Sequence, residues 1–348
     1  MDTITAKESK TKLSEPKTTI FKKIKKRYSW AWNCIGIQML ITQGLSFLLM
    51  IILTVILSAK TGANAASEIQ KYTIPIAALC FCIGNPLSAF ISLKATKAAK
   101  FSDYFKKPRI SAGLVILAVL ATLGISSVDS IIMNIFKSVF SASSEQLSDS
   151  ISNGVFSENI VLSIVSIAYV CVLGPFFEEL LCRGAIQSIG GHISPGFAVF
   201  ISAFMFGIFH LNISQFYNAF LLGILLGYVT LRSRSLWPAV IMHIANNSLS
   251  VLEMVIIKDM SEDKAASLIG IVTIVLAVVG MIALITFIIL EKKNNNKEMV
   301  VMTTNRPSTE EVISTGTKGM KLTVLPFFTR WQSFVIIAFF ILMCVSQS

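Results

Sequence analysis

Charged residues are scarce in this chain. Asp, Glu, Lys and Arg make up 14% of its 348 residues, whereas a soluble globular domain has about 25%. Hydrophobic residues make up 54% and fall in long runs between polar segments. This composition excludes an ordinary soluble domain. It predicts a polytopic membrane protein of the all-α class, because backbone groups in lipid must be hydrogen-bonded within helices.

Features of several other protein classes are also missing. The first thirty residues are polar and basic, without the short apolar core and cleavage site of a signal peptide. Six cysteines occur without the spacing of metal ligands, so we expect buried apolar residues rather than a disulfide framework. No internal repeat is visible, although many transporters are built from inverted repeats. These absences speak against a secreted disulfide-rich protein, a zinc module and a repeat-built transporter.

About eight apolar segments are expected to cross the membrane. A further apolar run, residues 334–345, is short for a span, which needs roughly 17–25 residues. It forms either a tilted ninth helix, with help from residues 325–331, or an interfacial anchor. The expected spans are residues 35–57, 72–93, 110–127, a fourth that starts near 159 and runs to the stretch 174–184, then 196–210, 216–230, 236–256 and 266–290.

Positive charge is concentrated in the polar segments beside alternate spans. The net charge of +11 comes from 30 Lys and Arg against 19 Asp and Glu. Basic residues gather in residues 1–33, 94–109 and 232–234, whereas 137–158 and 259–263 carry net negative charge. By the positive-inside rule the basic segments are cytoplasmic. We therefore expect a multi-pass protein of the cell membrane with a cytoplasmic N-terminus, and no nucleic-acid partner.

Polar segments flank a single membrane domain. Tyr28, Trp30 and Trp32 follow a lysine-rich run, which is typical of a tail that contacts anionic lipid at the membrane surface. The oligomeric state stays open. The expected parts are a basic N-terminal tail over 1–33, a membrane domain over 34–290 with its motifs at about 155–255, and a cytoplasmic linker with a C-terminal apolar segment over 291–348.

The stretch 174–184 places three ionisable side chains inside an apolar run. Each isolated charge at the centre of a membrane helix costs about 2.5–3.5 kcal/mol, so such a cluster marks a candidate functional site. On a helix, Glu179 and Arg183 are four residues apart and can pair. Glu178 points about 100° away from Glu179 and is available as a general base. The alternative is a purely structural ion pair at a membrane boundary.

Two of the three histidines lie in later predicted spans. His210 follows Phe206 by four residues and His243 precedes Asn247 by four, so each pair shares one helical face. A carboxylate and an imidazole can activate water. A second imidazole and a side-chain amide can donate hydrogen bonds to an oxyanion. With Glu178, these residues supply the groups that hydrolyse an amide.

Each of these residues also has a simpler explanation. A lone histidine in an apolar helix is usually a hydrogen-bonded core group, and an asparagine is usually a cap or an interhelical hydrogen bond. The third histidine, His192, lies in a Gly/Pro turn and is expected at the surface. The combination in three separate spans is what favours a catalytic site.

Three ordered motifs resemble those of a known family, the CAAX-protease and bacteriocin-processing (CPBP, Abi) family of intramembrane glutamate endopeptidases. The resemblance covers about residues 155–255. Asn246 makes the third motif ambiguous, and the family pattern selects its neighbour. The motifs that are similar in order and spacing are Glu178-Glu179-x-x-x-Arg183, Phe206-x-x-x-His210 and His243-x-x-x-Asn247.

The resemblance implies both a fold and an activity. An eight-helix core would surround a conical cavity that opens toward the cytosol and lipid. Such proteins hydrolyse peptide bonds of lipidated or membrane-associated peptides, and bacterial members are linked to pheromone maturation, bacteriocin processing and immunity. Members are described as metal-independent, so no metal and no cofactor are expected. The implied roles are water activation by Glu178 and His210, oxyanion binding by His243 and Asn247, and support by Glu179 and Arg183.

Three other interpretations stay open. A non-enzymatic immunity or regulatory partner could use the same fold. A transporter could use Glu178 and Arg183 in a proton or substrate path. Two histidines and two glutamates could bind zinc, although the signature His-Glu-x-x-His is absent. A composition rich in Lys, Ile, Ser and Asn is compatible with a low-GC bacterium, which favours a hydrophobic peptide or bacteriocin precursor over a prenylated protein as substrate.

Overall fold

The computed structural model describes residues 17–61, 65–135, 152, 155–191, 194–293 and 325–346. All regular elements in these ranges are helices. Seven of the described helical segments are long and apolar enough to cross a membrane, judged by length and composition. The described part of the chain is thus an all-α, multi-pass membrane protein, as its composition predicts. His192 and most of the predicted external segment 137–158 lie outside the described residues.

Each predicted span corresponds to a helix or a run of helical segments. Most boundaries differ by a few residues, but the first helix begins at Lys17 rather than at 35 and the third ends at Ile135 rather than at 127. The fourth span is one continuous rod in which two π-helical segments, η3 and η4, alternate with α-helix. The elements are α1 (Lys17–Thr61), α2 (Ala65–Gln70), α3 (Thr73–Thr96), η2 (Phe101–Asp103), α4 (Ala112–Ile135), α6 (Ile160–Ala168), η3 (Tyr169–Leu173), α7 (Gly174–Glu179), η4 (Leu180–Ile186), α8 (Gln187–Gly190), α9 (Pro195–Phe209), α10 (Ile213–Ser233), α11 (Trp237–Ile257), α12 (Glu262–Lys293) and α15 (Trp331–Ser346).

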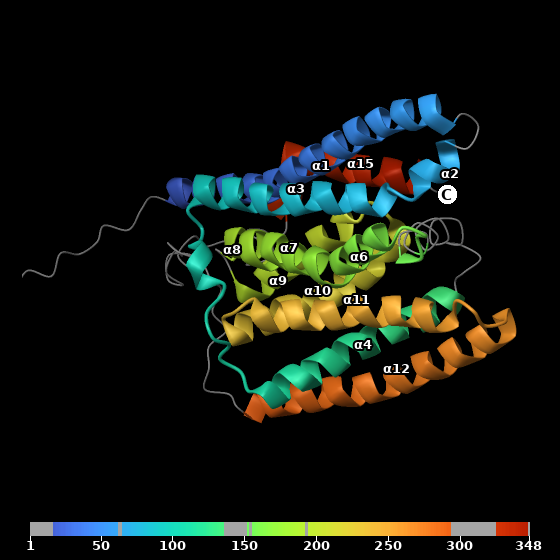
Figure 1. Cartoon of the computed structure of the whole chain (residues 1–348). Coiled ribbons are helices and arrows are strands. Elements are labelled where there is room, and N and C mark those ends of the chain that lie inside the picture. The colour runs from blue at the N-terminus through green and yellow to red at the C-terminus, as the bar shows by residue number, and fades with distance from the viewer. Residues whose placement is uncertain are drawn as a thin grey trace, which may run out of the picture.

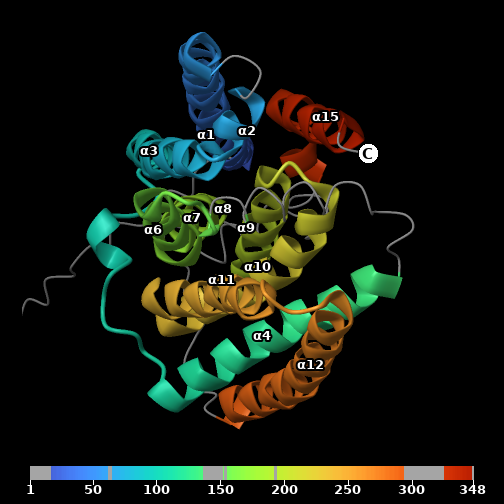
Figure 2. The same ribbon diagram turned by 45° about the vertical axis from the view of Figure 1, so that its right-hand side comes forward.

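The helices run mostly along one common direction and form three layers (Figure 1). The first layer holds α1, α3 and α15, and the middle layer holds the rod α6–α8 with α9 and α10. The third layer holds α11, α4 and α12, and Figure 2 shows α4 and α12 on the far side of α11 from the rod. The C-terminal half of the rod is enclosed, because every residue from 179 to 191 is buried, whereas α6 exposes Ile160 and Val161.

Polar contacts join the predicted basic loops at one end of the bundle. The Leu236 N–H donates to the Tyr104 carbonyl oxygen at 2.9 Å, and the Tyr104 hydroxyl donates to Ser188 Oγ at 3.1 Å. Arg232 forms an ion pair with Glu291. The α3–α4 loop, the end of α8, the α10–α11 turn and the end of α12 therefore lie together, as the alternation of basic loops predicts.

Helix α9 is too short to cross a membrane on its own. It begins at Pro195, where the Ser194 side chain accepts a hydrogen bond from the Phe197 N–H as an N-cap. Its 15 residues span about 22 Å, less than the roughly 30 Å of hydrocarbon. Its C-terminal end therefore stops inside the bundle. This places His210 at nearly the depth of Glu178, which lies about 18 Å before the end of α8.

The aromatic residues near the N-terminus are core residues. Helix α1 begins at Lys17 and continues without a break through the first predicted span. Tyr28 and Trp32 are 1% and 0% exposed. Trp32 stacks on Phe327 with ring centroids 4.9 Å apart and donates its Nε1–H to the Phe327 carbonyl oxygen at 3.0 Å. The prediction that these two residues lie at the membrane surface is wrong, because the C-terminal segment covers them.

The C-terminal apolar segment packs beside α1 (Figure 1). Helix α15 has 16 residues, a length of about 24 Å. The turn before it carries Phe327, which is 0% exposed, and Arg330 Nε donates to Ser29 Oγ at 2.8 Å. Its course along α1 agrees with a ninth helix of the bundle rather than with an interfacial anchor.

We expect the Phe327→Ala variant to lose about 3–5 kcal/mol of unfolding free energy, the usual cost of emptying a buried phenylalanine site. The matched control is Phe334→Ala on α15, where the side chain is 63% exposed. Both can be measured by unfolding the purified protein in mixed detergent and denaturing-detergent micelles. Equal losses in the two variants would show that Phe327 does not anchor the segment.

Candidate functional site

The Glu179 carboxylate binds two partners in the middle of the bundle. Arg183 Nη1 donates to Glu179 Oε1 at 2.7 Å, and His243 Nδ1 lies 2.9 Å from the same oxygen. Glu179 and Arg183 are 0% exposed and His243 is 5% exposed. The predicted pair of Glu179 and Arg183 is confirmed. The contact with His243 comes from another helix and was not predicted.

The ring of Phe206 packs against three side chains of this cluster. The Arg183 guanidinium lies 4.4 Å from its centroid, and the His210 and His243 rings lie 4.9 Å and 5.5 Å from it. Arginine over an aromatic face is a favourable cation–π arrangement. Gly223 on α10 leaves room for the guanidinium, because a Cβ there would lie 3.1 Å from Arg183 Nη2. Phe206 therefore brings the residues of all three motifs together.

A proline and a π-helical segment leave one backbone carbonyl free to bind the Asn247 side chain. In η3 the Gly174 N–H donates to the Tyr169 carbonyl five residues earlier. The next donor in this register would be Pro175, which has no N–H, so the Val170 carbonyl loses its partner within the helix. Asn247 Nδ2 donates to that carbonyl at 3.1 Å. π-Helical segments are frequent at functional sites, and here one holds an amide at a defined position.

A chain of polar side chains connects Asn247 with α4. Asn246 Nδ2 donates to Asn247 Oδ1 at 3.4 Å, and Ser126 Oγ donates to Asn246 Oδ1 at 2.6 Å. Asn218 Nδ2 lies 3.5 Å from Ser126 Oγ and donates to Asp129 Oδ2 at 3.1 Å. Asp129 is 6% exposed. The three members on α4 and α10 were not predicted; the available signal in the sequence was an acidic residue two positions beyond the predicted end of the third span.

His210 lies at a sharp turn between α9 and α10. Its Nδ1 is 2.7 Å from the Phe206 carbonyl oxygen, so a neutral ring that donates from Nδ1 keeps Nε2 as an acceptor. Leu211 follows with a φ of 54°, and this left-handed conformation costs a bulky residue about 1–3 kcal/mol. The Asn212 side chain then caps α10 by accepting the Gln215 N–H at 3.1 Å. The turn fixes the imidazole at the inner end of α9.

Glu178 faces the other nitrogen of His243. Its side chain is 13% exposed, and Oε2 lies 3.7 Å from His243 Nε2. This separation exceeds a hydrogen bond and lies within the range of an ion pair with a protonated ring. His243 thus lies between both glutamates. In the described part of the chain no hydrogen bond joins Glu178 to His210, the partner that the resemblance implies for water activation.

The arrangement has the parts of a hydrolytic site but no metal-binding group. Among the described residues, no three His, Cys, Asp or Glu side chains are placed to hold a metal ion. The predicted roles of the six site residues stay predictions. What the structure provides is one buried assembly of two carboxylates, two imidazoles and a guanidinium, with the Asn247 amide one helical turn from His243.

Comparison with known proteins identifies one matching family. Residues 160–249 match the model of the family described as Type II CAAX prenyl endopeptidase Rce1-like. The match begins at the first residue of α6 and ends within α11, so it includes all three motifs. No curated protein and no solved structure matches the chain.

We expect Arg183→Met to lower the unfolding free energy by about 3–5 kcal/mol, because it leaves a buried carboxylate without its cation. Glu179→Gln should also destabilise the protein. The double variant should recover much of the loss, since neither charge is then left unpaired. A double-mutant cycle from unfolding in mixed micelles measures this coupling, with Lys107→Met at an exposed position of the α3–α4 loop as a neutral control. Strictly additive losses would contradict the pairing.

Proposed function

We propose, from the match of residues 160–249 to the model of the Rce1-like type II CAAX prenyl endopeptidases, that this protein is an intramembrane endopeptidase. The family is one of proteases, which supports peptide-bond hydrolysis as the general activity. The observation that carries the proposal is the convergence of the three motifs on the Phe206 ring, where Arg183, His210 and His243 all make contact.

In the proposed reaction, Glu178 and His210 activate a water molecule. Glu178 is the more accessible glutamate, with 13% of its side chain exposed against 0% for Glu179. His210 can accept a proton at Nε2 while Nδ1 stays bound to the Phe206 carbonyl. The water oxygen attacks the scissile carbonyl carbon and its proton passes to Glu178. The same proton then moves to the leaving amine as the C–N bond breaks.

His243 and Asn247 are proposed to bind the oxyanion. They lie one turn apart on the same face of α11. With Nδ1 held by Glu179, the His243 imidazolium would donate from Nε2. The Asn247 amide nitrogen carries two hydrogens, of which one goes to the Val170 carbonyl and the second would go to the substrate. Glu179 and Arg183 support this by orienting the imidazole, as carboxylates orient histidines elsewhere.

The proposed substrate is a lipidated or hydrophobic peptide that reaches the site from the membrane. A site carried on membrane helices favours a membrane-associated peptide over a soluble one. The clustering of basic loops at one end of the bundle supports a cytoplasmic N-terminus in the cell membrane. A bacterial role in peptide or bacteriocin processing or immunity, without a metal ion, completes the proposal.

Cleavage of a fluorogenic, lipidated C-terminal peptide by the purified protein in liposomes tests the activity. Glu178→Gln keeps the size of the side chain and removes the base, so we expect a loss of cleavage by several orders of magnitude. Glu253→Gln on the outer part of α11 is the control and should keep the wild-type rate. A chelator should leave cleavage unchanged. Wild-type rates in Glu178→Gln would refute the assignment, and loss with chelator would return a metal to the site.

Removing one oxyanion donor typically lowers kcat by about 10²–10³, and we expect this for Asn247→Ala with little change in KM. Asn246→Ala should lower kcat less, because Asn246 only orients its neighbour through a 3.4 Å hydrogen bond. Steady-state kinetics of both variants on the same peptide distinguish the two roles. A larger loss in Asn246→Ala would show that the assignment of the two asparagines is reversed.

A further inference from the structure

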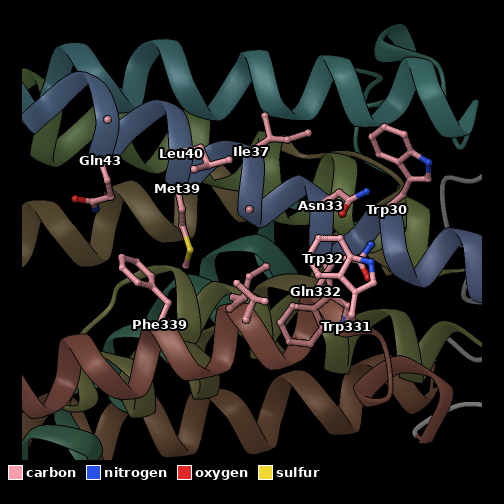
Figure 3. Close-up of a pocket in the computed structure, with 14 residues that line it drawn as sticks. Trp30, Trp32, Asn33, Ile37, Met39, Leu40, Gln43, Trp331, Gln332 and Phe339 are labelled. Atoms are coloured by element: carbon pink, nitrogen blue, oxygen red, sulfur yellow. The ribbon is translucent and has the colours of Figure 1, made fainter. Parts of the chain in front are cut away.

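A groove of about 590 Å³ lies between α1 and α15, outside the segment that carries the candidate site. Trp331 and Gln332 lie at one end and Phe339 and Gln43 toward the other (Figure 3). Leu40 lines the groove and yet is 77% exposed, so the groove is open along the apolar face of α1. Because α1 is long and apolar enough to span a membrane, the open side faces hydrocarbon.

The length and the lining of the groove indicate what kind of molecule it can bind. From Trp30 to Gly44 the lining runs along about 21 Å of helix. A volume of about 590 Å³ along that length describes a long groove rather than a round cavity. Its open side faces hydrocarbon and its lining is mostly apolar. The groove therefore has the shape and the surroundings that suit one hydrocarbon chain.

Exposed lysines of α1 lie beyond one end of the groove. The lining residues of α1 recur every three or four positions along one stripe of the helix, which includes Trp30 and Ile37. The same spacing carried toward the N-terminus reaches Lys26 and Lys22, and both are exposed. Trp30 and the 66% exposed Trp331 lie between this charge and the aliphatic part of the groove, as aromatic residues do at headgroup level. The surface thus matches a molecule with an anionic head and an apolar tail.

The geometry points to a binding site for one anionic phospholipid, with an acyl chain in the α1–α15 groove and the headgroup at Lys22 and Lys26. The contact would hold the C-terminal helix against α1 in addition to the Phe327 anchor. This site shares no residue with the proposed catalytic cluster, so it stands independently of the proposed function. The basic N-terminal segment is predicted to contact lipid, and this site would locate that contact at Lys22 and Lys26.

Native mass spectrometry of the full-length protein, released from micelles that contain equal amounts of phosphatidylglycerol and phosphatidylcholine, tests the site. We expect one retained phosphatidylglycerol, preferred over phosphatidylcholine by at least about fivefold, the selectivity that one lysine near an anionic lipid supplies. Gly44→Leu should abolish retention, because a Cβ at Gly44 meets nothing within 4 Å and its side chain would enter the groove. Gly270→Leu on α12, at an equally open and exposed glycine, is the matched control.

A second variant separates the headgroup from the chain. Lys22→Gln with Lys26→Gln alters only exposed side chains, so folding should be unaffected, and it should remove the preference while phosphatidylcholine is still retained. Equal retention of the two lipids by the wild type would overturn the headgroup site. Equal retention by Gly44→Leu and Gly270→Leu would overturn the groove as the place of the acyl chain.

Discussion

The candidate site depends on the pairing of one buried carboxylate. Glu179 is 0% exposed in the middle of an apolar bundle, where an unpaired charge would cost several kcal/mol. Its Oε1 atom binds Arg183 from its own helical segment and His243 from α11. The pairing of Glu179 therefore joins the rod α6–α8 to α11. It also orients the His243 ring so that Nε2 faces Glu178. The ion pair is therefore a positioning device as well as a structural one.

The shape of the bundle follows from helices that end or change register inside it. Helix α9 stops at a strained turn, which brings His210 to the depth of the glutamates. The π-helical segment before Pro175 frees the Val170 carbonyl for the Asn247 amide. Both features cost backbone free energy, and both place a polar group of the proposed mechanism. Their coincidence at one point supports a functional rather than a purely structural explanation of the cluster.

Much of this arrangement could be predicted from the sequence, and what could not depends on contacts between distant segments. Most helix boundaries and the pair of Glu179 and Arg183 follow from local periodicity, whereas the early start of α1 at Lys17 does not. The burial of Trp32 could not be predicted, because Phe327, almost three hundred residues later, covers it. The link from Asn246 to Asp129 was equally hidden, since it crosses three helices that no spacing rule connects. The depth of His210 depends on the early end of α9 at Phe209.

Side-chain ¹⁵N NMR of the histidines tests the central contact most directly, and the chain has only three histidines. Replacement of His192 and His210 in turn assigns the signals of His243. We expect a protonated, hydrogen-bonded Nδ1 in His243, because that nitrogen faces Glu179 Oε1 at 2.9 Å, and a clear shift of this signal in Glu179→Gln. An unprotonated Nδ1, or a signal that Glu179→Gln leaves unchanged, would contradict it.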